Sequence, residues 1–186
     1  FLYIDEAHAT GVVGQKGYGL TQGYGGQVDL VMGTFSKALG VSGAYACMSS
    51  DLKDYLVNTC AGLIYTTAPS PMLLAAAKAA WLILPSLSAE RAALQALRAY
   101  LRDQLMTMGC CVGGDSESAI LPLYLGKSCS ALSLRDHLAR SGIMVSAIRP
   151  PSVPPRKAMI RIALNVHHRK AGVDRLIKEI AQWQNR

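Results

Sequence analysis

The chain has 186 residues, of which 51% are hydrophobic and 17% charged, and its mean hydropathy is +0.21. This composition excludes a disordered or low-complexity protein, and the length suits one ordinary domain or two small ones. The net charge of +7 would suit nucleic acid, anionic lipid or an acidic protein as a partner. However, the basic residues are scattered, and the longest apolar run, 72–84, is interrupted by Lys78, so we expect neither nucleic-acid binding nor a membrane span.

The cysteines and the first residues indicate the cellular location of the protein and the extent of the sequence. The five cysteines form no CxxC pair and have no spacing typical of a metal site, so we expect reduced thiols, no metal and a cytoplasmic location. The chain begins at Phe1-Leu2-Tyr3-Ile4, an apolar run typical of a buried strand. We therefore expect that an upstream portion of the protein is missing from this sequence.

Apolar runs and turn residues indicate an α/β pattern in the first 84 residues. Two short apolar runs that end in polar residues are typical of buried parallel strands. The predicted elements are strands at 1–4 and 28–35 joined by a flexible glycine-rich connection (11–26), a strand at 43–48, a helix capped by Ser50-Asp51 that ends near Cys60, a strand at 63–67, and a long helix from Ser70-Pro71 that ends before Pro85.

The remaining residues, 85–186, predict a smaller α+β unit. A leucine stripe at helical spacing follows Ser88 and ends near Gly109, as expected for a helix that packs on a core (Leu94, Leu97, Leu101 and Leu105). The elements predicted after it are a strand at 119–125, a helix at 130–141, strands at 143–148 and 159–164, and a terminal helix at 170–183. We therefore divide the chain into 1–84 and 85–186.

A carboxylate and an imidazole follow the first predicted strand directly, in Asp5-Glu6-Ala7-His8. The carboxyl ends of parallel strands hold ligands in α/β folds, which makes this a candidate site. An exposed loop with ordinary charges is the alternative. A DEAH-box helicase would also need a phosphate-binding GxxxxGK[ST] motif, and these 186 residues contain none.

Lys37 follows the second predicted strand, in Thr34-Phe35-Ser36-Lys37. A lysine surrounded by apolar and small residues can attack a carbonyl as a Schiff-base lysine does, whereas a solvated surface lysine is the alternative. Pyridoxal phosphate (PLP) requires a lysine for its aldehyde and an acid for its pyridine nitrogen. Asp5 and Lys37 would meet these two needs if the two strands are parallel neighbours.

Four motifs in order along the chain resemble the α-oxoamine synthases, which are fold-type-I PLP enzymes. They are Asp5-Glu6-Ala7-His8-Ala9-Thr10-Gly11, Gly33-Thr34-Phe35-Ser36-Lys37-Ala38-Leu39-Gly40, Ile64-Tyr65-Thr66-Thr67-Ala68-Pro69-Ser70-Pro71 and Ile148-Arg149-Pro150-Pro151-Ser152-Val153-Pro154. The resemblance implies an α/β, fold-type-I PLP-dependent transferase. Residues 1–84 would be the C-terminal part of the PLP-binding large domain with a connector helix, and residues 85–186 a small α+β C-terminal domain.

The resemblance also implies roles for cofactor-binding residues. Lys37 would form the Schiff base with PLP and later move the proton at the α-carbon of the substrate. Asp5 would pair with the pyridinium nitrogen, and His8 would hydrogen-bond the phenolic oxygen of the ring. Thr34 matches a threonine that contacts the phosphate.

Further matches concern a partner subunit and the substrate. Thr66 and Thr67 match a hydroxyl pair that reaches the phosphate from the neighbouring subunit, which implies a homodimer with shared active sites. Arg161 matches the arginine that binds the carboxylate of the amino acid, a task suited to a guanidinium group. Ser152 stands where members of the family often carry threonine, and it would keep a hydroxyl on the substrate side.

Members of this family join an amino acid to an acyl thioester with loss of carbon dioxide. The stretch 148–151 is most similar to members that condense L-alanine with a pimeloyl thioester, carried by coenzyme A or an acyl carrier protein, in biotin biosynthesis. Glycine-using members, of the aminoketobutyrate ligase or aminolevulinate synthase type, remain an alternative. A catalytically silent fragment or a dimerising module is another, and we expect the 186-residue chain alone to be inactive.

Overall fold

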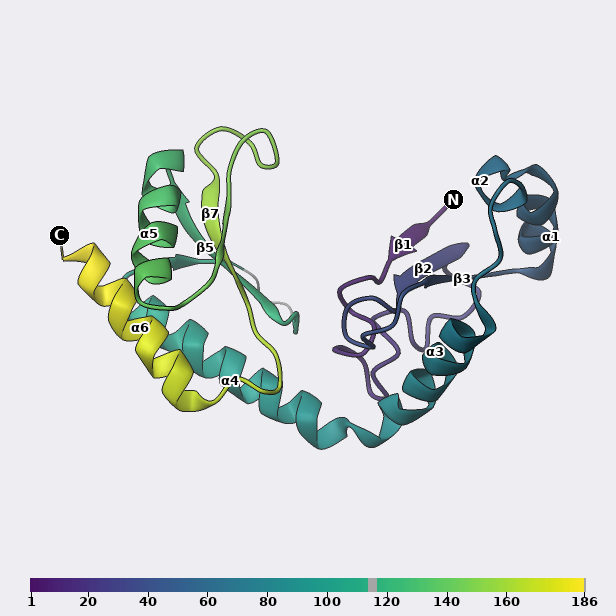
Figure 1. Cartoon of the computed structure of the whole chain (residues 1–186), viewed down its shortest axis with the longest axis horizontal. Helices are drawn as coiled ribbons and strands as arrows, with labels where there is room; N and C mark the ends of the chain where they lie inside the picture. Colours follow the sequence, from purple (N-terminus) through teal and green to yellow (C-terminus); the bar gives the residue numbers. More distant parts are fainter. Residues whose placement is uncertain (114–116, 186) are drawn as a thin grey trace. The chain divides into compact units, whose positions relative to one another are not determined.

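The computed structural model describes residues 1–113 and 117–185 and divides into two compact units, Phe1–Arg91 and Ala92–Arg186. The division falls inside a helix, seven residues beyond the boundary at 84/85 that we placed from the sequence. In chain order, the described elements are β1 (Tyr3–Asp5), β2 (Leu30–Thr34), β3 (Ala44–Met48), α1 (Ser50–Thr59), α2 (Ala61–Ile64), α3 (Pro71–Ile83), the 3-10 helix η1 (Leu84–Ser86), α4 (Ser88–Thr107), β4 (Cys111–Val112), β5 (Ile120–Gly126), α5 (Ser128–Arg140), β6 (Ser146–Ile148), β7 (Ala158–Ala163) and α6 (Lys170–Gln184) (Figure 1).

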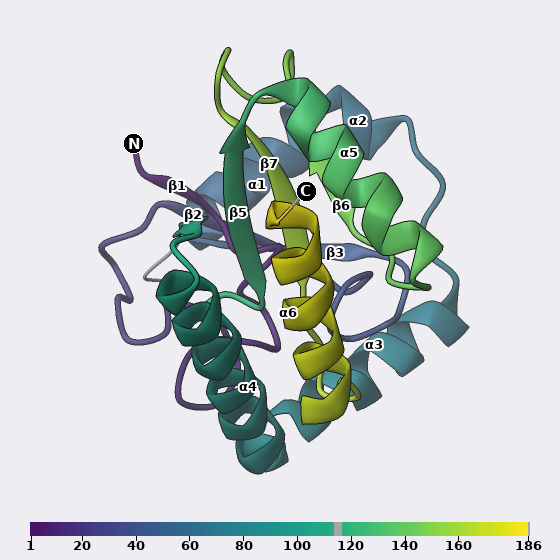
Figure 2. The ribbon, with the colours of Figure 1, turned by 90° about the vertical axis from the view of Figure 1, so that its left-hand side faces the viewer.

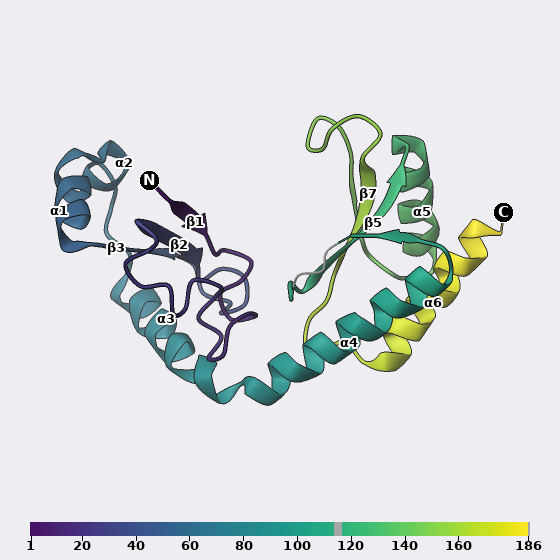
Figure 3. The ribbon, with the colours of Figure 1, turned by 180° about the vertical axis from the view of Figure 1, so that it is seen from behind.

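The first unit contains a three-stranded sheet in the order β1-β2-β3. The predicted parallel pairing of its first two strands is confirmed, with Tyr3 opposite Leu30 and Asp5 opposite Met32. Strand β3 returns antiparallel to β2. Helix α3 passes along one side of this sheet (Figure 3). Its Trp81 packs edge-on against the ring of Tyr45 on β3, with ring centroids 5.2 Å apart.

Two predicted helix starts in the first unit agree with the structure to within one residue. The Ser70 hydroxyl accepts a hydrogen bond of 3.3 Å from the backbone N–H of Met72, and Pro71 is the first helical residue of α3, as predicted. Helix α1 is also present, but its cap is Ser49 rather than the expected Ser50-Asp51. The Ser49 hydroxyl accepts from the N–H of Leu52 at 3.3 Å.

The predicted strand at 63–67 is wrong, because this stretch contains the end of the short helix α2 followed by irregular chain. Its backbone hydrogen bonds are local, from the N–H of Ile64 to the carbonyl of Cys60 and from the N–H of Tyr65 to that of Ala61. A short apolar run fits a strand and a helical turn equally well, and only the available partner decides between them.

The second unit is an α+β fold, as predicted, built on an antiparallel sheet in the order β4-β5-β7-β6. Figure 2 shows α5 and α6 over one face of this sheet. Alternate residues of the two central strands point to that covered face, because successive side chains of a strand point to opposite sides. The largest fully buried side chains of the described part of the unit are Leu101, Leu105, Leu121, Leu123, Leu134, Leu138, Ile160 and Ile180.

Elements of the second unit differ from the prediction mainly at their ends. Strand β6 covers only 146–148 of the predicted 143–148, and the two-residue strand β4 was not predicted. In the leucine stripe of α4, Leu101 and Leu105 are fully buried, whereas Leu97 is only half-buried. Within the described part of the chain, no single helix has the length and apolarity to cross a bilayer, and the stretches 71–86 and 88–107 meet these criteria only when taken together.

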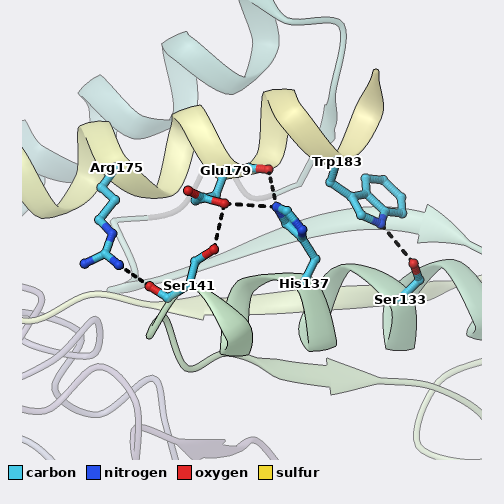
Figure 4. A network of polar contacts seen from close by, with 6 residues as sticks. All are labelled: Ser133, His137, Ser141, Arg175, Glu179 and Trp183. Carbon is cyan, nitrogen blue, oxygen red and sulfur yellow. Dashed lines mark hydrogen bonds and ion pairs between the residues drawn. The ribbon is translucent and has the colours of Figure 1, made fainter. Parts of the chain in front are cut away.

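A polar network joins α5 to α6 in the second unit (Figure 4). The buried His137 ring lies with Nε2 3.0 Å from Glu179 Oε2 and 3.1 Å from the Glu179 backbone carbonyl. The Ser141 hydroxyl donates to the same carboxylate at 2.7 Å, and the Arg175 guanidinium donates to the Ser141 carbonyl. Because both helices supply partners, these polar side chains meet hydrogen-bond partners at the helix contact.

Candidate active site

The parallel pair β1 and β2 brings two of the predicted site segments to one edge of the sheet. Strand β1 ends at Asp5, which lies opposite Met32 on β2, and β2 then ends at Thr34. Neighbouring strands lie about 4.8 Å apart, so Asp5 and the segment from Thr34 to Lys37 lie at the same carboxyl-terminal edge. Both Asp5 and Lys37 are exposed there.

One oxygen of the Asp5 carboxylate is held by the chain itself. Its Oδ1 accepts a hydrogen bond of 2.8 Å from the backbone N–H of Ala7, in the turn that follows β1. The other oxygen, Oδ2, remains available to a ligand as far as the described residues are concerned. His8 lies on the same turn and is exposed, whereas its neighbours Ala7 and Ala9 are buried.

Glu6 points in the opposite sense, into the interior of the first unit. It is fully buried, and its carboxylate accepts backbone hydrogen bonds from Leu20 at 2.9 Å and from Thr21 at 2.6 Å. A Cβ at Gly19, where φ is +101°, would lie 2.8 Å from Glu6 Oε1, so only glycine fits. Glu6 thus holds the backbone at Leu20 and Thr21, within the glycine-rich connection that we expected to be flexible.

The turn after β1 is also joined to β3. The Thr10 hydroxyl donates to the Glu6 carbonyl at 2.9 Å, and the Tyr45 hydroxyl lies 2.9 Å from the same Thr10 oxygen. Tyr45 reaches Thr10 across β2 at Gly33, where any Cβ would collide with the tyrosine ring. Burial raises the pKa of Tyr45, so its phenol remains protonated at neutral pH and donates to Thr10.

Thr34 and Ser36 form a hydroxyl pair at the end of β2. Their side-chain oxygens lie 2.7 Å apart, and Thr34 Oγ1 donates to the Gly43 carbonyl at 3.0 Å. The N–H of Ser36 also donates to Thr34 Oγ1, at 3.2 Å. These contacts hold the start of the segment that carries Lys37.

Not all predicted site residues lie on this edge. Thr66 and Thr67 are exposed on the segment after α2, and within the described residues no hydrogen bond joins them to Asp5, Thr34 or Lys37. This placement is compatible with the expected role in a neighbouring subunit.

Arg161 and Ser152 belong to the second unit. Arg161 is half-buried in β7, opposite Pro122 on β5 and Ser146 on β6, and it points away from the face where Ile160 and Ile162 are buried. Ser152 is exposed in the loop between β6 and β7, and its N–H donates to the Arg149 carbonyl at 3.0 Å.

The chemistry of the residues at the sheet edge fits PLP. A carboxylate with one oxygen held and one available suits a protonated pyridine nitrogen, and an exposed amine nearby suits an aldehyde. Hydroxyl groups at Thr34 and Ser36 suit a phosphate. The set therefore contains groups of the right type for the ring nitrogen, the aldehyde and the phosphate of the cofactor.

Sequence reasoning did not find the roles of Glu6, Thr10 and Tyr45. Their partners lie far along the chain, 15 positions away for Glu6 and Thr21 and 35 for Thr10 and Tyr45. The one available indication was the density of glycines between Gly11 and Gly26, which is typical of backbone that approaches another group closely.

The amino-acid sequence matches the family described as Aminotransferase class I and II over residues 1–180. The chain belongs to this family. It is 48% identical, over 181 residues, to a putative 8-amino-7-oxononanoate synthase of Bordetella pertussis, a match that covers 97% of this chain and 45% of that protein. The resemblance to α-oxoamine synthases is thereby confirmed.

Solved structures show the same fold. A serine palmitoyltransferase variant from S. paucimobilis with a bound PLP–myriocin aldimine is 26% identical, with a TM-score of 0.89 over 98% of this chain and 47% of that one. An 8-amino-7-oxononanoate synthase from Francisella tularensis is 26% identical, with a TM-score of 0.88 over 99% of this chain and 55% of that one. The expected α/β, fold-type-I PLP-dependent transferase fold is confirmed, and the chain spans about half the length of the proteins it matches.

Proposed function

We propose that the protein containing this chain condenses L-alanine with a pimeloyl thioester, with loss of carbon dioxide, to give 8-amino-7-oxononanoate in the cytoplasm. The observation that carries the proposal is the position of Asp5 and Lys37 at the ends of two parallel neighbouring strands. The relatives that carry the name of this enzyme support the choice of substrates. The acyl donor is a thioester of coenzyme A or of an acyl carrier protein.

PLP, when bound, supplies an electron sink for the carbanion that forms at the α-carbon of the amino acid. Lys37 would bind the aldehyde of the cofactor through its amine and then accept the α-proton of the amino acid. Oδ1 of Asp5 is already held by the N–H of Ala7, so Oδ2 would be the oxygen that accepts a hydrogen bond from the ring nitrogen. The negative charge of the carboxylate would keep that nitrogen protonated. His8 would donate to the phenolic oxygen of the ring.

The phosphate would lie against the hydroxyl of Thr34 on one subunit and against those of Thr66 and Thr67 on a second copy of the chain. Both copies would then contribute to each active site of a homodimer. Arg161 would bind the carboxylate of the amino acid through two parallel hydrogen bonds, and Ser152 would offer a hydroxyl to the substrate. The 186-residue chain alone would lack turnover.

The test uses the full gene product that contains these 186 residues, mixed with PLP, reduced with borohydride and mapped by peptide mass. We expect an adduct on Lys37 and none in Lys37→Ala, whereas Lys53→Ala, which alters an exposed lysine of α1, keeps the adduct. Carbon dioxide release is then compared for L-alanine with a pimeloyl thioester and for glycine with a short acyl thioester. Turnover with glycine alone would favour a glycine-using relative, and turnover by the lysine variant would contradict the mechanism.

A further inference from the structure

The turn at residues 6–10 presents a single side chain outward. Glu6, Ala7, Ala9 and Thr10 are all buried, with exposed fractions of 9% or less, and only His8 is exposed. Asp5, directly before the turn, is held by the N–H of Ala7. The conformation of this turn therefore decides where both Asp5 and His8 point.

Thr10, the last residue of the turn, is hydrogen-bonded to Glu6, the first residue. Its hydroxyl and its backbone N–H both donate to the Glu6 carbonyl, each at 2.9 Å. A carbonyl oxygen only accepts, so the single hydroxyl proton of Thr10 is used on Glu6. The Tyr45 hydroxyl, 2.9 Å from Thr10 Oγ1, must then be the donor in the second contact.

Tyr45 itself has several packing contacts that fix the position of its ring. Its ring lies over Gly33 and against Phe35 and Trp81, with ring centroids 5.5 and 5.2 Å away. The backbone N–H of Glu6 also donates to the Met32 carbonyl on β2, at 2.6 Å. The turn is thus bonded to β2 at its first residue and to β3 at its last.

We propose that Thr10, through its hydrogen bond from Tyr45, is a positioning residue that sets the orientation of Asp5 and His8 toward the cofactor. The proposal rests on the proposed function, since it assigns a cofactor task to Asp5 and His8. Thr10 itself is buried, and the proposal gives it no contact with the cofactor or the substrate. It acts by fixing the N–H of Ala7, which holds Asp5 Oδ1, and by leaving His8 as the exposed member of the turn.

The test is a pH titration of the visible absorption band of PLP bound to the full gene product. Thr10→Val has nearly the same shape but lacks the hydroxyl, so it loses the side-chain hydrogen bonds to Glu6 and from Tyr45. Thr10→Ser keeps the hydroxyl. We expect Thr10→Val to move the midpoint of the titration in the same direction as Asp5→Asn, and to weaken PLP binding about tenfold, the loss of roughly one net hydrogen bond. Thr10→Ser should restore both properties.

A second variant keeps the proposal testable if Thr10→Val fails to fold. Tyr45→Phe removes only the phenol oxygen, and it leaves the ring contacts with Phe35 and Trp81 in place. Its effect should not add to that of Thr10→Val, because Thr10→Val already removes the hydrogen bond from Tyr45 together with the one to Glu6. In the cofactor-free protein, amide hydrogen exchange of Ala7 and Thr10 should become faster in both.

The outcomes separate this inference from the proposed function. If Asp5→Asn moves the titration midpoint but Thr10→Val and Tyr45→Phe match the unmodified protein, the positioning role is wrong while the proposed function stands. If the unmodified protein forms no absorption band with PLP, the proposed function fails and the positioning role fails with it. A shift in Thr10→Val that Thr10→Ser does not restore would also overturn the positioning role.

Discussion

Oε1 of Glu6 accepts a hydrogen bond of 2.6 Å from the backbone N–H of Thr21, across 15 positions of the chain. The same buried carboxylate accepts from Leu20 with its other oxygen. A carboxylate is strongly favoured at such a place, because each oxygen meets a donor and neither N–H remains unpaired. This contact holds the part of the glycine-rich loop at Leu20 and Thr21.

Replacing Glu6 with Gln should destabilise the first unit by about 2 kcal/mol, because the amide nitrogen would face an N–H donor. Denaturant unfolding measures the loss, and amide hydrogen exchange of Leu20 and Thr21 should become faster. Glu90→Gln, which alters an exposed residue of α4, is the control and should change the unfolding free energy by less than about 0.5 kcal/mol. Equal effects of the two variants would contradict the role of Glu6.

Two glycines of the same loop form a matched pair. Gly19 and Gly23 have similar φ values, +101° and +97°, but a Cβ at Gly23 meets nothing within 4 Å, whereas one at Gly19 meets Glu6. Substitution by alanine costs about 1 kcal/mol of backbone strain at either site. Gly19→Ala should cost a further 1 to 3 kcal/mol, roughly, because the Glu6 carboxylate must move. Unfolding midpoints of the two variants give the difference, and a difference near zero would refute the close contact.

The contact of Ser141 with Glu179 predicts a pH dependence for the second unit. The Ser141 hydroxyl, with smaller contributions from His137 and Arg175, holds the pKa of the Glu179 carboxyl below its ordinary value of 4.5. A lowered pKa means that the unfolded chain takes up the proton first as the pH falls. The contribution of Glu179 is therefore complete above pH 4.5 and disappears as the pH falls through the lower, folded value.

Ser141→Ala should remove the main cause of that shift, so the pKa of Glu179 should rise toward its ordinary value. The difference in unfolding free energy between Ser141→Ala and the unmodified protein should shrink as the pH falls from about 6 to about 3. Denaturant unfolding at several pH values measures it, and an NMR titration of Glu179 reports the pKa directly. A difference that grows on acidification would show that the sign is wrong.

Replacing Arg161 should weaken binding of the amino acid more than binding of the cofactor. In the full gene product, Arg161→Ala should raise the KM for the amino acid between about 10-fold and 100-fold, the loss of hydrogen bonds from a charged group, with little change in PLP affinity. Arg161→Lys keeps the charge but not the paired geometry, and should fall in between. Arg140→Ala, at the exposed end of α5, is the control. An unchanged KM in Arg161→Ala would show that Arg161 does not bind the amino acid.

Much of the local structure could be predicted because it depends on neighbouring residues. Ser70 and Pro71 start α3 by capping chemistry that is complete within a few residues, and the leucines of α4 repeat at helical spacing. The stretch 63–67 could not be predicted in the same way. Its apolar residues fit either a strand or a helical turn. The structure has the end of α2 here, where the N–H groups of Leu63, Ile64 and Tyr65 donate to carbonyls three or four positions earlier in the chain.

The sequence by itself determined the family, because the motifs around Asp5 and Lys37 carry the chemistry of the site in their residue types and order. Only the tertiary structure decided how the turn that follows Asp5 and carries His8 is held. Glu6 meets Thr21, and Thr10 meets Tyr45 across Gly33, through contacts between residues far apart in the chain. Such contacts leave no periodic pattern, since a hydrogen bond depends on where the folded backbone brings two groups and not on their spacing along it.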